Sequence, residues 1–160
     1  MSLRTTESVR VPAPPALVFP HVAALDRYPH WMRLVHDAVP TDSEGVPTAD
    51  PPADPPAWTV ELRARVGPFA RSKQLRMVRR LHEPDRLVEF ERAEVDGRQH
   101  ARWALRVDVE AADDDSSVVT MHLAYDGALW TGGLLDRVLD DEIRRARAGL
   151  TAVVTGEPTR

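Results

Sequence analysis

The C-terminal part of the chain has the periodicity of one long amphipathic helix. From residue 134 to 154, apolar side chains recur every three or four positions and charged side chains occupy the opposite positions. Glu142 alone among the acidic residues projects onto the apolar side, next to the small residues Ala146 and Gly149. A carboxylate beside small residues predicts an interior that is partly hollow and partly polar at this point. The apolar positions are Leu134, Leu135, Val138, Leu139, Ile143, Ala146, Leu150, Val153 and Val154.

Residues 58–127 change to a period of two, which predicts strands. Alternating apolar positions run through residues 58–66, 75–81, 88–90, 103–109 and 119–125. Asp96-Gly97 is a strong hairpin signal, and residues 113–115 form an acidic turn. The connections are short, so these strands are expected to form an antiparallel meander with one buried face.

The N-terminal part combines a short strand, two short helices and a proline-rich segment. Residues 5–11 predict a strand that ends at the prolines, 16–24 a helix, 26–32 a second helix capped by Asp26, and 34–39 a strand. Residues 40–57 hold 6 of the 14 prolines and almost no large apolar residue, which predicts a mobile loop. Too little chain precedes this loop to form a second core, so residues 1–160 are expected to fold as one domain.

This order of elements predicts an α+β fold. An antiparallel sheet of six or seven strands would wrap around the long C-terminal helix, with the two short helices covering the space between them. Two segments carry a family resemblance: VRVPAPPALVFPHVAALDRYPHWM (residues 9–32) and GGLLDRVLDDEIRRARAGL (residues 132–150). They resemble the helix-grip fold of the START-like (SRPBCC) superfamily, which includes polyketide cyclases, coenzyme Q-binding proteins and plant Bet v 1-like proteins. The resemblance implies an internal cavity for a lipid, quinone, polyketide or other apolar ligand; it does not imply catalysis.

Strand parity supplies possible polar partners inside this cavity. The parity of Leu75, Met77 and Leu81 also turns Arg79 inward, and the parity of Val88 and Phe90 turns Arg92 inward. Because an unpaired buried carboxylate is costly, we expect Glu142 to find an arginine or to take up a proton. With Arg79 or Arg92 it would form a polar patch. Such a patch would orient a ligand carbonyl or hydroxyl; alternatively, these are structural ion pairs, or the arginines reach water.

The aromatic side chains suit the wall of an apolar site, and they suit an ordinary core equally well. Among them, Tyr28 and Trp31 belong to a short helix that could act as a lid. Glu142 is the candidate catalytic residue. The predicted cavity is lined by Tyr28, Trp31, Trp58, Arg79, Phe90, Arg92, Trp103, Met121, Tyr125, Leu139, Glu142 and Ala146.

Composition excludes several classes of function. The chain has no cysteine, which rules out disulfides, thiolate zinc sites and a cysteine nucleophile. Its six histidines show no metal-binding spacing, so we expect neither a metal nor a cofactor. A net charge of −4 with well-mixed signs argues against a nucleic-acid partner, and no apolar run is long enough for a membrane span. We expect a cytoplasmic monomer or homodimer.

Three functions are compatible with these features. The leading hypothesis is binding of a small hydrophobic or amphipathic molecule between the sheet and the C-terminal helix. The alternative is an enzyme similar to polyketide cyclases or dehydratases, in which Glu142 with Tyr125 or an inward arginine would move protons. The third is a protein-interaction module whose cavity is vestigial.

Overall fold

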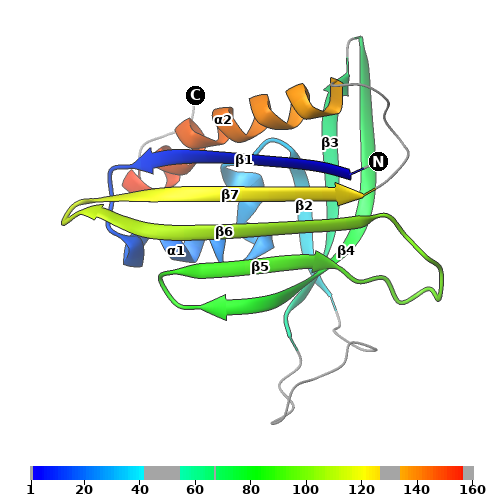
Figure 1. Ribbon diagram of the computed structural model, residues 1–160, viewed down its shortest axis with the longest axis horizontal. Coiled ribbons are helices and arrows are strands. Elements are labelled where there is room, and N and C mark those ends of the chain that lie inside the picture. Colours follow the sequence, from blue (N-terminus) through cyan, green and yellow to red (C-terminus); the bar gives the residue numbers. More distant parts are fainter. Residues whose placement is uncertain (1, 42–54, 67, 127–133, 157–160) are drawn as a thin grey trace.

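The computed structural model describes residues 2–41, 55–66, 68–126 and 134–156 of the chain, and it places one sheet around one long helix (Figure 1). All strand pairs are antiparallel, and the strand order is β1-β7-β6-β5-β4-β3-β2. The predicted α+β helix-grip arrangement is therefore confirmed. The elements are β1 (Ser2–Val11), α1 (Pro15–Val22), the 3-10 helix η1 (Leu25–His30), β2 (Val35–Thr41), β3 (Ala57–Val66), β4 (Phe69–Glu83), β5 (Leu87–Arg92), β6 (Arg102–Asp113), β7 (Ser116–Asp126) and α2 (Leu134–Thr155).

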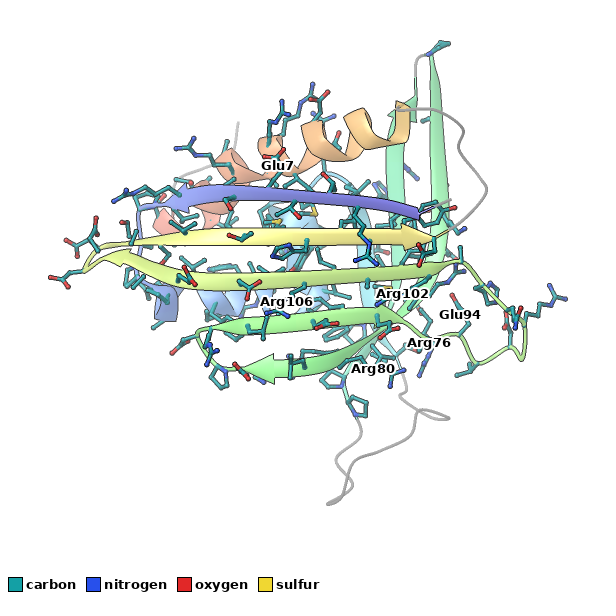
Figure 2. All side chains as sticks on the ribbon, in the orientation of Figure 1. Glu7, Arg76, Arg80, Glu94, Arg102 and Arg106 are labelled. Carbon is teal, nitrogen blue, oxygen red and sulfur yellow. The ribbon has the colours of Figure 1, made fainter. Side chains whose placement is uncertain are left out.

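The sheet is strongly bent, and its inner face carries the core. In Figure 1, β3 and the first part of β4 run across the direction of β1, β7, β6 and β5, whereas the last part of β4 runs beside β5. Helix α2 lies along β1, with its first turn near the end of β3. Buried and less buried residues alternate along β7 as the period of two predicts. The outer face carries charged side chains, including Arg102 and Arg106 on β6 (Figure 2). The space enclosed by the sheet is thus closed by α1, η1 and α2.

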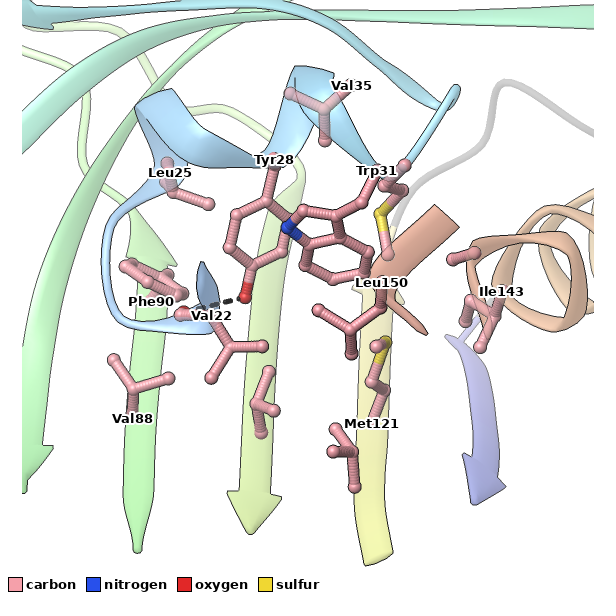
Figure 3. Packing of buried hydrophobic residues seen from close by; sticks show 14 of the residues in the cluster. Val22, Leu25, Tyr28, Trp31, Val35, Val88, Phe90, Met121, Ile143 and Leu150 are labelled. Atoms are coloured by element: carbon pink, nitrogen blue, oxygen red, sulfur yellow. Dashed lines mark hydrogen bonds between the residues drawn. The ribbon is translucent and has the colours of Figure 1, made fainter. Parts of the chain in front are cut away.

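The inner side of α2 packs into this core through the predicted apolar positions. Ile143, Ala146 and Leu150 are almost fully buried. In Figure 3, Leu150 lies beside Trp31, which follows η1, and beside Met121 from β7. The amphipathic pattern therefore correctly predicted which side of α2 faces the sheet.

Gly149 lets α2 approach the end of η1 more closely than any other residue would. A Cβ atom at this position would overlap the backbone oxygen of Trp31 and lie 3.0 Å from its carbonyl carbon. Real Cβ atoms do not approach a backbone oxygen so closely, so one of the two backbones would have to move. The glycine in the predicted apolar stripe thus has a packing role.

Three local predictions need correction. Leu81 is 38% exposed, because a register shift between Arg79 and Leu81 ends the alternation of β4. Asp26 does not cap η1: the N-cap is Ala24, and the Asp26 carboxylate accepts a hydrogen bond from Trp58 Nε1 at 2.9 Å. The ends of the predicted loop 40–57 belong to strands β2 and β3, and its residues 42–54 lie outside the described part of the chain.

Candidate functional site

Glu142 is a buried carboxylate on the inner side of α2, as its position in the apolar stripe predicted. The residue is 8% exposed and sits beside the buried Ile143. One carboxylate oxygen, Oε1, lies 3.7 Å from Nη2 of Arg33, which follows η1. The other oxygen, Oε2, is buried and has no hydrogen-bond partner among the described residues. The hydrogen-bonding capacity of this second oxygen is therefore unused among the described residues.

Glu142 does lie near an arginine, as expected, but this residue is Arg33. Neither of the proposed partners, Arg79 and Arg92, pairs with it, although both turn inward. Arg79 pairs across the sheet with Phe90, and Arg92 with Met77, so all four share the inner face. Arg79 Nη1 donates to the backbone oxygen of Ala23 at the end of α1, at 2.7 Å. Burial lowers the pKa of the Arg79 guanidinium.

Arg92 is occupied by groups near the end of its own strand. Its Nε donates to Glu94 Oε1 at 2.9 Å, and its Nη1 donates to the backbone oxygen of Ala101 at 3.2 Å. The same Glu94 oxygen accepts the backbone N–H of Arg76 at 3.0 Å; both residues are labelled in Figure 2. Both inward arginines thus bind nearer acceptors than Glu142, a preference that strand parity alone does not reveal.

A pocket of about 500 Å³ opens beside Glu142, where η1, β2, β3 and β4 meet α2. The pocket is rich in basic side chains, although Glu142 also lines it. His36 Nε2 and Arg63 Nη2 both lie near Glu61 Oε2, at 3.5 and 3.6 Å. Sequence reasoning missed Arg33 and Arg63, because exposed arginines are common and nothing in their spacing marks them. The lining residues are Pro29, Arg33, Val35, His36, Arg63, Ala70 and Glu142.

Trp103 and Tyr125 form a second polar feature on the inner face. They are partners in the register of β6 and β7, and their ring centroids lie 4.5 Å apart. Trp103 is 6% and Tyr125 is 2% exposed. Neither the indole Nε1 nor the phenol oxygen has a hydrogen-bond partner among the described residues. Two buried polar groups on adjacent strands therefore lack partners within the described part of the chain.

The other predicted aromatic residues have their polar atoms satisfied within the core. Tyr28 is fully buried, and its hydroxyl donates to the backbone oxygen of Val22 at 2.9 Å (Figure 3). Trp31 Nε1 donates to the backbone oxygen of His21, also at 2.9 Å. The rings of Tyr28 and Phe90 meet edge to face, with centroids 6.0 Å apart. These contacts give Tyr28 and Trp31 a structural role; their predicted role as a lid stays a prediction.

The remaining predicted cavity residues fall into three groups. Trp58 packs edge to face on Phe90, with centroids 5.7 Å apart. Met121 and Ala146 are buried in the same core cluster. The side chain of Leu139 lies outside the described residues. Most of the predicted cavity residues thus belong to the packed core, and Trp103, Tyr125 and Glu142 are the predicted residues that have buried polar atoms without partners among the described residues.

Comparison with known proteins identifies the family. Residues 2–155 match the model of the family described as polyketide cyclase / dehydrase and lipid transport, and the chain belongs to this family. No curated protein matches the chain significantly in sequence. The predicted START-like helix-grip fold is also confirmed, because solved structures share it across nearly the whole chain.

Three of these structures are similar at low sequence identity. A START superfamily protein from Mycobacterium smegmatis has a TM-score of 0.70 at 11% identity, covering 96% of this chain and 97% of its own. The ZhuI aromatase/cyclase from Streptomyces sp. R1128 has a TM-score of 0.66 at 13% identity, with coverages of 97% and 94%. A protein from Thermus thermophilus has a TM-score of 0.72 at 14% identity, with coverages of 96% and 98%. At these identities the likeness shows the fold alone.

The family and the fold together support a coarse conclusion about function. The helix-grip fold of a polyketide cyclase / dehydrase and lipid transport family is one that suits hydrophobic ligands or cyclase chemistry. Within the described residues, neither α-helix is long and apolar enough to cross a membrane.

Proposed function

We propose that the protein binds a small amphipathic molecule between the inner face of the sheet and α2. The observation that carries this proposal concerns three of the four buried side-chain polar atoms without hydrogen-bond partners among the described residues: Trp103 Nε1, the Tyr125 hydroxyl and Glu142 Oε2. All three belong to residues that are at most 8% exposed. A ligand with polar atoms on an apolar body would satisfy them.

The energetic argument is that such atoms are expensive in a protein without a ligand. Each unpaired buried polar group costs about 1–3 kcal/mol. An interior selected only for stability would replace them with apolar side chains or pair their polar atoms, as it pairs those of Tyr28 and Trp31. A ligand oxygen that accepts from Trp103 or Tyr125 would remove this cost and gain a hydrogen bond in a low-dielectric surrounding. The family description, which includes lipid transport, supports the same class of ligand.

Native mass spectrometry of the purified protein, followed by solvent extraction, tests this proposal. We expect a bound mass of an amphipathic compound, or thermal stabilisation when a panel of fatty acids, quinones and aromatic polyketides is added. Absence of both a bound mass and any stabilisation would contradict the proposal. That outcome would instead favour a protein-interaction module with a vestigial cavity.

A cyclase- or dehydratase-like enzyme is the second candidate, and Glu142 is the observation that favours it. Its free oxygen Oε2 belongs to a carboxylate that lines a pocket, where it can take a proton from a ligand carbon or hydroxyl. The ZhuI aromatase/cyclase shares the fold. If the protein is an enzyme, Glu142→Gln abolishes turnover and leaves the thermal unfolding midpoint unchanged. If it only binds, the same variant changes affinity modestly.

A further inference from the structure

The pocket beside Glu142 has a hydrogen-bond acceptor, the Glu142 carboxylate, next to a hydrogen-bond donor, the Arg33 guanidinium. Arg33 Nη2 and Glu142 Oε1 are 3.7 Å apart, which is beyond hydrogen-bond distance. Glu142 Oε2 is buried without a partner among the described residues. Both charged groups thus keep capacity for a ligand placed beside them. The Glu142 side chain is only 10% exposed, so the acceptor has a fixed place in the wall.

The charges of the pocket select among ligand head groups. A plain carboxylate would bind Arg33 and would be repelled by the Glu142 carboxylate. An ammonium group would bind Glu142 and would be repelled by Arg33 and Arg63, which both line the pocket. A plain alcohol would donate to Glu142 and leave the guanidinium groups without a strong acceptor. A head that carries a hydroxyl donor beside an acidic acceptor satisfies both sides.

The pocket also borders the apolar interior. Val35 lines it and is 5% exposed, as part of the main core cluster. Figure 3 shows Val35 on the same side of the core as Tyr28 and Trp31. An apolar tail that leaves the pocket past Val35 would enter the space that the sheet and α2 enclose.

We propose that this pocket binds the head group of an amphipathic hydroxy acid. The carboxylate of the ligand accepts hydrogen bonds from Arg33, and Arg63, which lines the same pocket beside Glu61, is a further cation. The hydroxyl on a neighbouring carbon donates to the Glu142 carboxylate, which lines the pocket. The proposal rests on the function proposed above and narrows its ligand to this chemical class.

Binding of three probes with the same chain length tests the head group: 3-hydroxydodecanoic acid, dodecanoic acid and 1-dodecanol, measured by isothermal titration calorimetry. We expect the hydroxy acid to bind about tenfold more tightly than either of the others, which is the size of one partly exposed charge-assisted hydrogen bond. Arg33→Met should weaken the hydroxy acid by about the same factor and leave 1-dodecanol unchanged. Arg27→Met is the matched control, because Arg27 is an exposed residue of η1 that does not line the pocket.

Glu142→Gln supplies a second, independent variant. The amide removes the repulsion of a plain carboxylate and offers it a donor, so dodecanoic acid should gain affinity and the preference for the hydroxy acid should disappear. Equal affinities of the three probes for the wild-type protein would overturn the head-group proposal and leave the binding function intact. The same conclusion follows if Arg33→Met behaves like Arg27→Met. If none of the probes binds, both proposals fail for this ligand class.

Discussion

The two tyrosines of the chain provide a sharp test of whether the interior is built for a ligand. Both are buried, Tyr28 completely and Tyr125 with 2% of its surface exposed. The Tyr28 hydroxyl donates to the Val22 backbone oxygen at 2.9 Å, whereas the Tyr125 hydroxyl has no partner among the described residues. Replacing each with phenylalanine removes one oxygen and keeps the ring, so the two variants differ only in what the oxygen does.

The expected changes have opposite signs. Tyr28→Phe breaks a buried hydrogen bond and leaves the Val22 carbonyl without its partner, which lowers the free energy of unfolding by about 2 kcal/mol. At about 2–4 °C for each kcal/mol in a domain of this size, the unfolding midpoint should fall by about 4–8 °C. Tyr125→Phe loses no hydrogen bond and no longer buries an unpaired hydroxyl. Its free energy of unfolding should stay the same or rise by up to about 1 kcal/mol.

Urea titration of the ligand-free protein, followed by circular dichroism, measures both differences under one set of conditions. The slope m should match the wild-type value in each variant, since neither changes the surface exposed on unfolding. If Tyr125→Phe destabilises the protein as much as Tyr28→Phe does, the Tyr125 hydroxyl is already satisfied in the free protein. The reasoning that assigns it to a ligand would then be refuted.

Three further results are expected. Gly149→Ala should lower the free energy of unfolding by about 1–2 kcal/mol, because a Cβ that overlaps the Trp31 oxygen costs more than the helix propensity that alanine gains. Ala148→Gly measures the helix propensity of the same exchange at a neighbouring position. An unfolding midpoint of Gly149→Ala above that of the wild-type protein would contradict this prediction. Burial raises the pKa of Tyr28 above its ordinary value of 10.0, so the unfolded chain loses this proton at a lower pH than the folded protein. The free energy of unfolding should therefore fall as the pH rises past about 10. Urea midpoints measured from about pH 9 to 11 should fall less steeply in Tyr28→Phe than in the wild-type protein. Burial lowers the pKa of His82 below 6.5, so the unfolded chain binds this proton at a higher pH than the folded protein. The free energy of unfolding should therefore fall as the pH drops below about 6.5. If stability depends on pH in the same way in His82→Gln, this prediction is contradicted.

The fold could be predicted from the sequence because its signals are local and repeated. The period of two along β7 and the stripe on α2 each sample the same face many times, so single exceptions do not hide the pattern. Leu81 shows where the method fails: one register shift in β4 moves a side chain to the other face, and nothing in the alternation marks the position of the shift.

The candidate site was predictable only in part, because periodicity shows which face a side chain occupies but not which groups on that face lie close to it. Helical spacing identified Glu142 as the buried acid, and strand parity placed Arg79 and Arg92 on the inner face. Their partners were not predictable. Arg79 donates to the Ala23 carbonyl and Arg92 donates to the Glu94 carboxylate. A backbone carbonyl that accepts a hydrogen bond has no signature in the sequence. Arg33 reaches Glu142 because η1 and α2 are packed together, a contact between segments far apart in the chain.

The linear order of the sheet also has a consequence for self-association. A sheet that does not close has two free edges, here β1 and β2, and a free edge can template pairing with another chain. Along β1 lies α2, joined to it by an ion pair between Arg144 and Glu7 at 3.6 Å. The other edge, β2, is short, contains Pro40 and shifts register between Val35 and Asp37. Both edges thus resist the addition of a strand from a second copy of this protein.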